Sequence, residues 1–256
     1  MLVDLLFDPF GAHWDDVHDG ALAAEEAGFA GVWLYDHLAG SVHGATSVLE
    51  CWTTLTALAA TVPRLNVGPL VLNVANRDPG TLAVMAATLQ EVSGGRLLLG
   101  LGAGGGTDTP YAAEQMALRR EVAGGAARRR AVEDAVAVLR AVWTGATGGA
   151  SGFLRPEPPP PIVIGGFGPK MAELAGRIGD GLNTPAGPRL GSLVAVAREA
   201  HARSGRDPAT FVVTASGRAT PSELERLGAL GVDRVIVFVA PPFPDAVARA
   251  HAALGP

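Results

Sequence analysis

Hydrophobic positions along the chain follow two patterns that alternate from end to end. Short, almost continuous runs of Val, Ile and Leu are typical of strands buried on both faces of a parallel sheet. Between them lie longer stretches in which apolar residues recur every three or four positions, as in an amphipathic helix. The runs predict strands at 3–7, 31–35, 65–72, 96–101, 162–164, 181–183, 211–215 and 235–239. The stretches predict helices at 14–27, 50–60, 79–92, 128–143, 169–178, 190–204, 221–230 and 244–254.

These elements form eight consecutive strand–helix units, which predict an α/β fold, a (β/α)8 TIM barrel. An open, doubly wound sheet is the alternative that the same alternation permits. No shift in composition marks a domain boundary, so we expect residues 1–256 to form a single barrel domain. The Gly- and Pro-rich segment 145–161 predicts a loop inserted before the fifth strand. Thr220, with Glu223 three residues later, predicts a capping box at the start of the following helix.

Composition and charge narrow the class of protein. Of the 256 residues, 48% are hydrophobic and 18% are charged, which excludes a disordered chain. The net charge of −5 argues against a nucleic-acid partner, because nothing supplies a basic face for phosphates. Cys51 is the single cysteine, so no intramolecular disulfide can form. The sequence shows no basic N-terminal region and no apolar run near the ~20 residues of a membrane helix, so we expect a cytoplasmic protein without a signal peptide or membrane anchor.

The loop after the fifth predicted strand is the strongest candidate for ligand binding. In a barrel, functional residues lie on the loops that follow the carboxyl ends of the strands. Glycines in such a loop let a ligand approach the backbone, and exposed N–H groups at a helix start favour an anion. The loop therefore predicts a phosphate site, with a plain tight turn as the alternative. Its residues are Gly165, Gly166 and Gly168, then Pro169 and the only lysine of the chain, Lys170.

Two other strand ends carry candidate residues. The glycine cluster GLGAGGG at 100–106 predicts a flat wall against which a planar ring can lie, with a flexible, ligand-free loop as the alternative. As a dinucleotide fingerprint it is weak, because no acidic residue follows at the ribose-binding distance. His37 follows the second strand and can donate a hydrogen bond or exchange a proton near neutral pH. Its alternative is a structural histidine, held by Asp36 or by backbone.

Other kinds of catalytic site find no support in the sequence. The remaining histidines show no metal-ligand spacing, so we expect no metal. Motifs for a serine or cysteine nucleophile are absent as well. A barrel mouth with a phosphate site, glycine walls and few charges suits a cofactor that brings its own chemistry.

Three stretches resemble the bacterial luciferase-like superfamily, which contains flavin-dependent monooxygenases and coenzyme F420-dependent oxidoreductases. They are AAEEAGFAGVWLYDHL, the segment from LECWTTLTALAA to RLLLGLGAGGG, and PPPIVIGGFGPKMAELAGRIGDGLNTP. The resemblance covers residues 3 to 190, and its specific part is SGGR-x-x-LGLGAG combined with IGG-x-G-P.

This resemblance implies a luciferase-like barrel with an isoalloxazine-like ring in its mouth. It places the active-site histidine of the family at His37, and a non-proline cis peptide behind the ring near Leu70-Val71. Asn73 then lies where a polar side chain can reach the edge of the ring. The wall beside the ring maps to Gly102, Ala103 and Gly104, and the phosphate loop maps to Gly165, Gly166, Gly168, Pro169 and Lys170.

From this resemblance we expect an oxidoreductase that uses coenzyme F420 to move a hydride to or from a small organic substrate. An FMN-dependent monooxygenase and a non-catalytic flavin- or deazaflavin-binding barrel are the alternatives. Some F420-dependent dehydrogenases carry an acidic proton donor just after the strand-four glycines. Gly105 stands there in this chain, which argues against dehydrogenation of a sugar alcohol.

Two further expectations concern the identity of the cofactor and the oligomeric state. F420 has a long polyglutamate tail, so a basic groove leading out of the mouth would favour it over FMN. Arg77, Arg119 and Arg120 are the candidates for such a groove. We also expect a homodimer.

Overall fold

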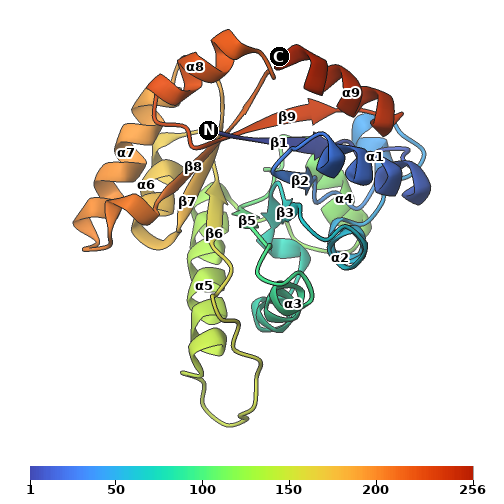
Figure 1. The fold of residues 1–256 in the computed structure, drawn as a ribbon. Coiled ribbons are helices and arrows are strands. Elements are labelled where there is room, and N and C mark those ends of the chain that lie inside the picture. The colour runs from blue at the N-terminus through green and yellow to red at the C-terminus, as the bar shows by residue number, and fades with distance from the viewer. Residues whose placement is uncertain (256) are drawn as a thin grey trace.

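The computed structural model describes residues 1–255, and one parallel sheet organises them. Its strands are β1 (Leu2–Phe7), β2 (Gly31–Leu34), β3 (Asn66–Pro69), β4 (Leu72–Asn73), β5 (Leu99–Gly102), β6 (Ile162–Gly165), β7 (Gly181–Pro185), β8 (Val212–Gly217) and β9 (Arg234–Val239). They lie in the order β3-β2-β1-β9-β8-β7-β6-β5-β4, so strands consecutive in sequence pair in the sheet, except for β3 and β4, and β1 pairs with β9. A parallel bridge between Val67 and Leu97 closes the ring. The fold is the predicted TIM barrel and not an open sheet (Figure 1).

Helices surround this barrel. They are α1 (Trp14–Glu26), α2 (Cys51–Thr61), α3 (Pro79–Val92), α4 (Tyr111–Ala117), α5 (Gly125–Thr144), α6 (Pro169–Ile178), α7 (Leu190–Arg203), α8 (Pro221–Ala229) and α9 (Phe243–Ala253). The predicted helices are all present, with ends within about three residues of those expected from the sequence. The sequence did not predict α4, nor the short 3-10 turns at Gly40–His43, Val74–Asn76 and Pro208–Thr210. In residues 1–255, no helix combines the length and the apolar character that crossing a bilayer requires.

The third predicted strand needs correction. It was expected to run unbroken over 65–72, but it is divided into β3 and β4 on either side of Leu70 and Val71. The peptide bond between these two residues is cis, as the resemblance implied. The Val71 side chain lies against the barrel wall at two glycines. A Cβ placed on Gly102 would come within 2.4 Å of a Val71 methyl carbon, and one on Gly165 within 2.9 Å.

Two hydrophobic layers hold the barrel together. Leu6, Trp33, Leu70 and Ile236 pack inside it, while a larger cluster fills the space between strands and helices. Asp4 is also completely buried. Its carboxylate accepts hydrogen bonds from Trp33 Nε1 at 3.0 Å and from Arg234 at 2.7 and 2.8 Å, so that the first, second and last strands are tied together.

Two smaller sequence predictions have different outcomes. The segment 145–161 is a loop between α5 and β6, as expected, and in Figure 1 it extends well below the barrel. The capping box is wrong in its contacts. Thr220 occupies the N-cap of α8 but makes no capping hydrogen bond with its side chain. Glu223 instead accepts from Arg226 at 2.8 Å, because the neighbouring guanidinium competes for the carboxylate.

Candidate functional site

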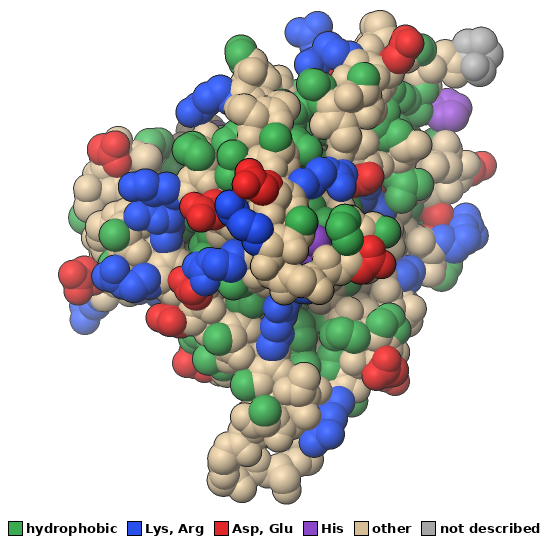
Figure 2. Space-filling view, turned by 90° about the vertical axis from the view of Figure 1, so that its left-hand side faces the viewer, with side chains coloured by type: hydrophobic (Ala, Val, Ile, Leu, Met, Phe, Trp, Pro, Cys, Tyr) green, Lys and Arg blue, Asp and Glu red, His purple; other side chains and the backbone are tan. Residues whose placement is uncertain are grey.

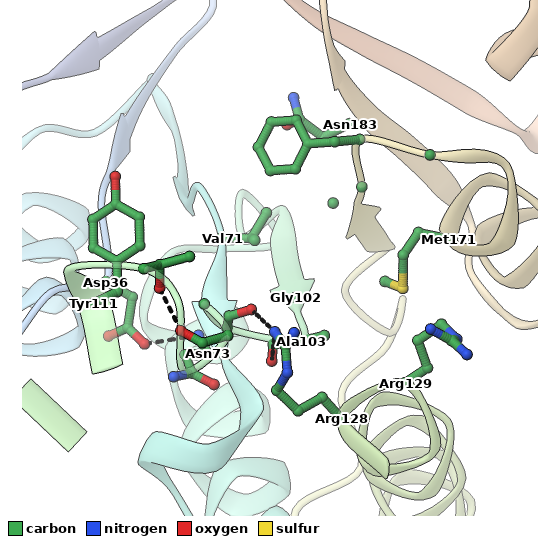
Figure 3. A pocket seen from close by; sticks show the side chains of 18 of the residues that line it. Asp36, Val71, Asn73, Gly102, Ala103, Tyr111, Arg128, Arg129, Met171 and Asn183 are labelled. Carbon is green, nitrogen blue, oxygen red and sulfur yellow. Dashed lines mark hydrogen bonds between the residues drawn. The ribbon is translucent and has the colours of Figure 1, made fainter. Parts of the chain in front are cut away.

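A cavity of about 850 Å³ opens at the carboxyl ends of the strands (Figure 3). The structure brings together every site residue expected from the sequence, although their roles in binding and catalysis stay predictions. Those in the lining are His37, Leu70, Val71, Asn73, Gly102, Ala103, Gly104, Gly165, Gly166, Gly168, Pro169 and Lys170.

The wall formed by the loop after β5 consists mostly of backbone. Gly104 adopts a left-handed conformation with φ of +67° and lies directly against Asn73, since a Cβ on Gly104 would be 2.5 Å from Asn73 Oδ1. That oxygen accepts a hydrogen bond from Ala75 N at 3.0 Å. The Asn73 side chain is therefore held in the lining of the cavity, and its contact with the edge of a ring stays a prediction.

His37 is held by a residue that the sequence analysis missed. Glu114 Oε1 lies 3.1 Å from His37 Nδ1, and Glu114 Oε2 accepts from Leu38 N at 2.9 Å. Burial acts to raise the pKa of Glu114, but the hydrogen bonds from His37 and Leu38 outweigh it and leave the pKa below its usual value. An ionised Glu114 can only accept hydrogen bonds, so His37 Nδ1 carries a proton, and in the neutral ring the lone pair is therefore on Nε2.

Asp36, the expected alternative partner of His37, is engaged elsewhere. Its carboxylate accepts from Arg77 at 3.0 and 3.1 Å and from Asn73 N at 2.9 Å. Arg77 also pairs with Glu50 and is largely buried. Burial lowers the pKa of Arg77, but the two carboxylates outweigh it and raise the pKa above its usual value. Arg77 therefore braces the loops after β2 and β4, and its assignment to a groove for the cofactor tail is wrong.

The other two arginines proposed for that groove also lie outside the cavity lining. Arg120 donates to Asn76 Oδ1 at 3.1 Å, so its charge is directed at the short turn after β4. The cations at the mouth are Arg128 and Arg129, from the start of α5, together with Lys170. The sequence analysis did not predict that these three cations lie together, because this depends on how the fold places the N-termini of α5 and α6.

Aromatic rings surround His37 on the side of the cavity away from α6. The His37 ring centroid lies 4.7 Å from that of Tyr111, 5.4 Å from Phe10 and 5.6 Å from His43. Tyr35 also lines the cavity, and burial with the nearby Asp8 carboxylate raises the pKa of its hydroxyl, which therefore stays protonated. This part of the cavity can receive an apolar molecule that bears one polar group next to His37.

The opposite part of the cavity has free hydrogen-bond donors and positive charges, which favour an anion. Gly168 is the N-cap of α6, and the backbone N–H groups of Phe167, Gly168 and Lys170 find no acceptor within residues 1–255. Arg128 donates to the carbonyls of Ala103 and Gly104, while its Nε is buried without a partner. Figure 3 shows Arg129 on the α6 side of α5, below Met171. Free N–H groups and cations at one place are what a phosphate requires.

These features fit a cofactor with a planar ring and a phosphate. The glycine wall and Val71 provide a flat surface for a ring, and the α6 start provides unpaired donors for a phosphate. Among residues 1–255, no three His, Cys, Asp or Glu side chains come together in a way that could hold a metal ion.

A signal for the cations was present in the sequence. Three consecutive arginines, Arg128 to Arg130, stand at the beginning of α5, and its first turn contains no acidic residue. Cations are unfavourable at the positive end of the helix dipole, which suggests that they serve a ligand. Glu114 offered no such signal, since α4 is only seven residues long and lies 77 positions from His37.

Several known proteins are similar to this chain in sequence. Relatives include an F420-dependent glucose-6-phosphate dehydrogenase from Microbacterium testaceum, which is 32% identical over 184 residues, 68% of this chain and 53% of the relative. A 5,10-methylenetetrahydromethanopterin reductase from Methanolobus tindarius is 28% identical over 243 residues, 90% of this chain and 69% of the relative. The chain spans about half the length of the glucose-6-phosphate dehydrogenases that it matches.

Solved structures show the same fold at low identity. An F420-dependent secondary alcohol dehydrogenase in complex with an F420-acetone adduct superposes with a TM-score of 0.82 at 18% identity, covering 100% of this chain and 99% of the other. A monooxygenase from Streptomyces bottropensis gives 0.76 at 19% identity, with 99% and 97% covered. The sequence profile of the luciferase-like monooxygenases matches residues 7–225. The chain therefore belongs to the luciferase-like monooxygenase family.

Proposed function

We propose that this protein is an oxidoreductase that binds coenzyme F420 and moves a hydride between its deazaflavin ring and a small alcohol or carbonyl compound. One observation carries the proposal. A single cavity has the His37–Glu114 pair on one side, unpaired donors and cations on the other, and a glycine wall between them. The names of the F420-dependent relatives support the choice of cofactor.

Different residues of the chain would bind the ring and the phosphate of the cofactor. Gly102, Ala103 and Gly104 would lie along the ring with Val71 behind it, and Asn73 would reach the ring edge. Phe167, Gly168 and Lys170 would hold the phosphate through their free backbone N–H groups, and Lys170 would add its ammonium. The deazaflavin, when bound, supplies or accepts the hydride.

His37 and Glu114 would handle the proton. As the carbon of an alcohol gives up a hydride, its hydroxyl must lose a proton, and His37 Nε2 is the acceptor that the site offers. Glu114 then stabilises the imidazolium through Nδ1. In the opposite direction the same nitrogen returns the proton to a carbonyl oxygen. Such a positioned acid–base group contributes ~10²–10⁴-fold to a rate. Glu114 thus brings a carboxylate to the site despite Gly105, but it acts through His37.

Other expectations from the sequence remain proposals of the same kind. We propose a small-molecule substrate, a cytoplasmic location, a homodimeric assembly and no nucleic-acid partner.

The proposal is tested by thermal unfolding with each cofactor. A ligand that binds only the native state at 100 times its Kd adds about 2.7 kcal/mol. For a domain of this size that is a rise in Tm on the order of 5–10 °C. We expect the rise with F420 and not with FMN. Loss of F420 absorbance with a panel of alcohols then tests catalysis. A rise with FMN alone would favour the monooxygenase, and F420 binding without hydride transfer would favour a non-catalytic barrel.

A further inference from the structure

A second hollow adjoins the cavity on the outside of the barrel. It has a volume of about 420 Å³ and lies between α5 and α6. Arg129 and Lys170 line both the cavity and this hollow, so the two spaces adjoin at these side chains. We call the hollow the α5–α6 groove. Its remaining lining residues are Ala126, Arg130, Glu133, Glu173, Leu174 and Arg177.

The α5–α6 groove is basic although the whole chain is acidic. Four of its side chains are cationic and two are carboxylates, so its net charge is +2, whereas the chain carries −5. Arg129, Arg130 and Lys170, at the end next to the cavity, pair with no carboxylate in residues 1–255. The far end is different, since Arg177 is paired with Glu133 at 2.5 Å. Figure 2 shows Lys and Arg side chains gathered on this side of the molecule, with carboxylates among them.

Folding alone gives no reason for this distribution. Arg129 and Arg130 stand near the positive end of α5, and Lys170 stands at the positive end of α6. Lys170, in the first turn of α6, opposes the helix dipole. Arg129 and Arg130, the fifth and sixth residues of α5, add two further cations without a carboxylate partner to the same lining. A bound polyanion would interact favourably with all three charges.

We propose that the α5–α6 groove binds the first glutamates of the F420 tail and thereby selects F420 over FMN, an inference that rests on the proposed function. Gly168 lines the cavity, and Lys170, two residues later, lines both the cavity and the groove, so a chain leaving a phosphate at this loop would meet Arg129 and Lys170. FMN ends at its phosphate and has nothing to place there.

The dimensions of the groove set how much of the tail it holds. It runs from Ala126 to Glu133 along α5 and from Lys170 to Arg177 along α6. At about 1.5 Å of rise per residue, each span is about 10 Å. An extended chain advances about 3.5 Å per residue, so the groove holds at most about three glutamyl residues. Glutamates beyond these reach solvent past the Arg177–Glu133 pair.

Titration of the whole protein with F420 species of defined tail length tests the proposal. Species with no, one, two and five glutamates are added, and Kd is measured by calorimetry. We expect Kd to fall about tenfold between no and two glutamates and then to stay level. Raising the salt concentration should weaken the two-glutamate species more than the tail-less one, because exposed charges are screened.

A charge-reversal variant locates the effect. Arg130→Glu should reduce the advantage of the two-glutamate species over the tail-less species by at least about fivefold. Arg249→Glu makes the same change of charge on the exposed face of α9 and is the matched control. The ratio of the two dissociation constants should stay at the wild-type value in that control.

The outcomes separate this inference from the proposed function. Equal Kd values for all tail lengths, or equal effects of the two variants, would overturn the groove assignment and leave F420 binding intact. Failure of every F420 species to bind would overturn both.

Discussion

Glu114→Gln should reverse the tautomer of His37. Glu114 accepts from two donors, His37 Nδ1 on one oxygen and Leu38 N on the other. A carboxamide of the same shape can accept at one end only and must donate at the other. With its oxygen kept on Leu38 N, the amide NH₂ group faces His37 Nδ1, which must then accept. The ring proton moves to Nε2, which can no longer take a proton from a substrate.

The two consequences differ greatly in size. A hydrogen bond to a charged group is worth ~1.5–3 kcal/mol and a neutral one ~0.5–1.5 kcal/mol, so we expect a loss of about 1–2 kcal/mol of stability. Turnover should fall at least ~100-fold, because the proton acceptor is lost. The affinity for F420 should change by less than about twofold, since Glu114 lies on the side away from the cations that favour a phosphate.

The stability difference should depend on pH. The pKa of Glu114 is lowered in the folded protein from the 4.5 of an unperturbed carboxyl. Its contribution is therefore complete above the unfolded pKa and is lost as the pH falls through the folded pKa. The gap between wild type and Glu114→Gln, measured by urea unfolding, should narrow below about pH 4.

Three measurements check the reasoning. The ¹⁵N shifts of the His37 ring report the tautomer, steady-state rates report turnover, and Glu91→Gln serves as a charge-matched control on an exposed site of α3. His37→Ala should lose turnover by a similar factor. A Glu114→Gln variant that keeps the proton on Nδ1, or that turns over like wild type, would refute the assignment.

Two further predictions concern the phosphate loop and the barrel core. Gly168→Val should leave the fold intact, because a Cβ at this position meets no atom within 4 Å. It should raise the Kd for F420 at least about tenfold, which corresponds to 1.4 kcal/mol. Unchanged affinity by titration would contradict a phosphate at this loop. Gly166 is a poorer site for the same test, since its Cβ would lie 2.3 Å from Met171 Cβ and disturb the protein itself. Asp4→Ala should cost about 3–5 kcal/mol in urea unfolding, because it leaves the buried Arg234 guanidinium without its carboxylate; a loss under about 1 kcal/mol would show that the charge is satisfied elsewhere.

The sequence predicted the barrel because strands buried on both faces can be recognised as short runs of adjacent apolar residues. Strands such as β9 and β6 contain three adjacent Val and Ile residues, a short β-branched run that is typical of a buried strand. No change in the hydrophobic pattern indicates the break between β3 and β4, because Leu70 and Val71 are apolar like the residues next to them. The helix α4 is too short for helical periodicity to stand out.

The site was predictable only where it follows from topology. Parallel strands bring their carboxyl ends together, so His37 and Lys170 could be expected at one mouth before any contact was known. The partners of charged side chains depend on tertiary packing. Arg77 was open to assignment as a tail ligand until its contacts with Asp36 and Glu50 were seen, and nothing local indicates that Glu114 reaches His37.

The connection from β5 to α5 contributes to every part of the cavity. Residues 103–129 include the glycine wall, Tyr111, Glu114 and the cations Arg128 and Arg129. Parts of the proposed ring contact, proton transfer and anion preference are thus encoded in one contiguous stretch of about a tenth of the chain, whereas His37 and Lys170 come from other strand ends. In evolutionary terms, recombination that replaced this stretch would change the wall, the partner of His37 and two cations of the mouth together. Luciferase-like barrels could diversify by swapping such a cassette, whereas stepwise change would have to pass through sites whose parts no longer match.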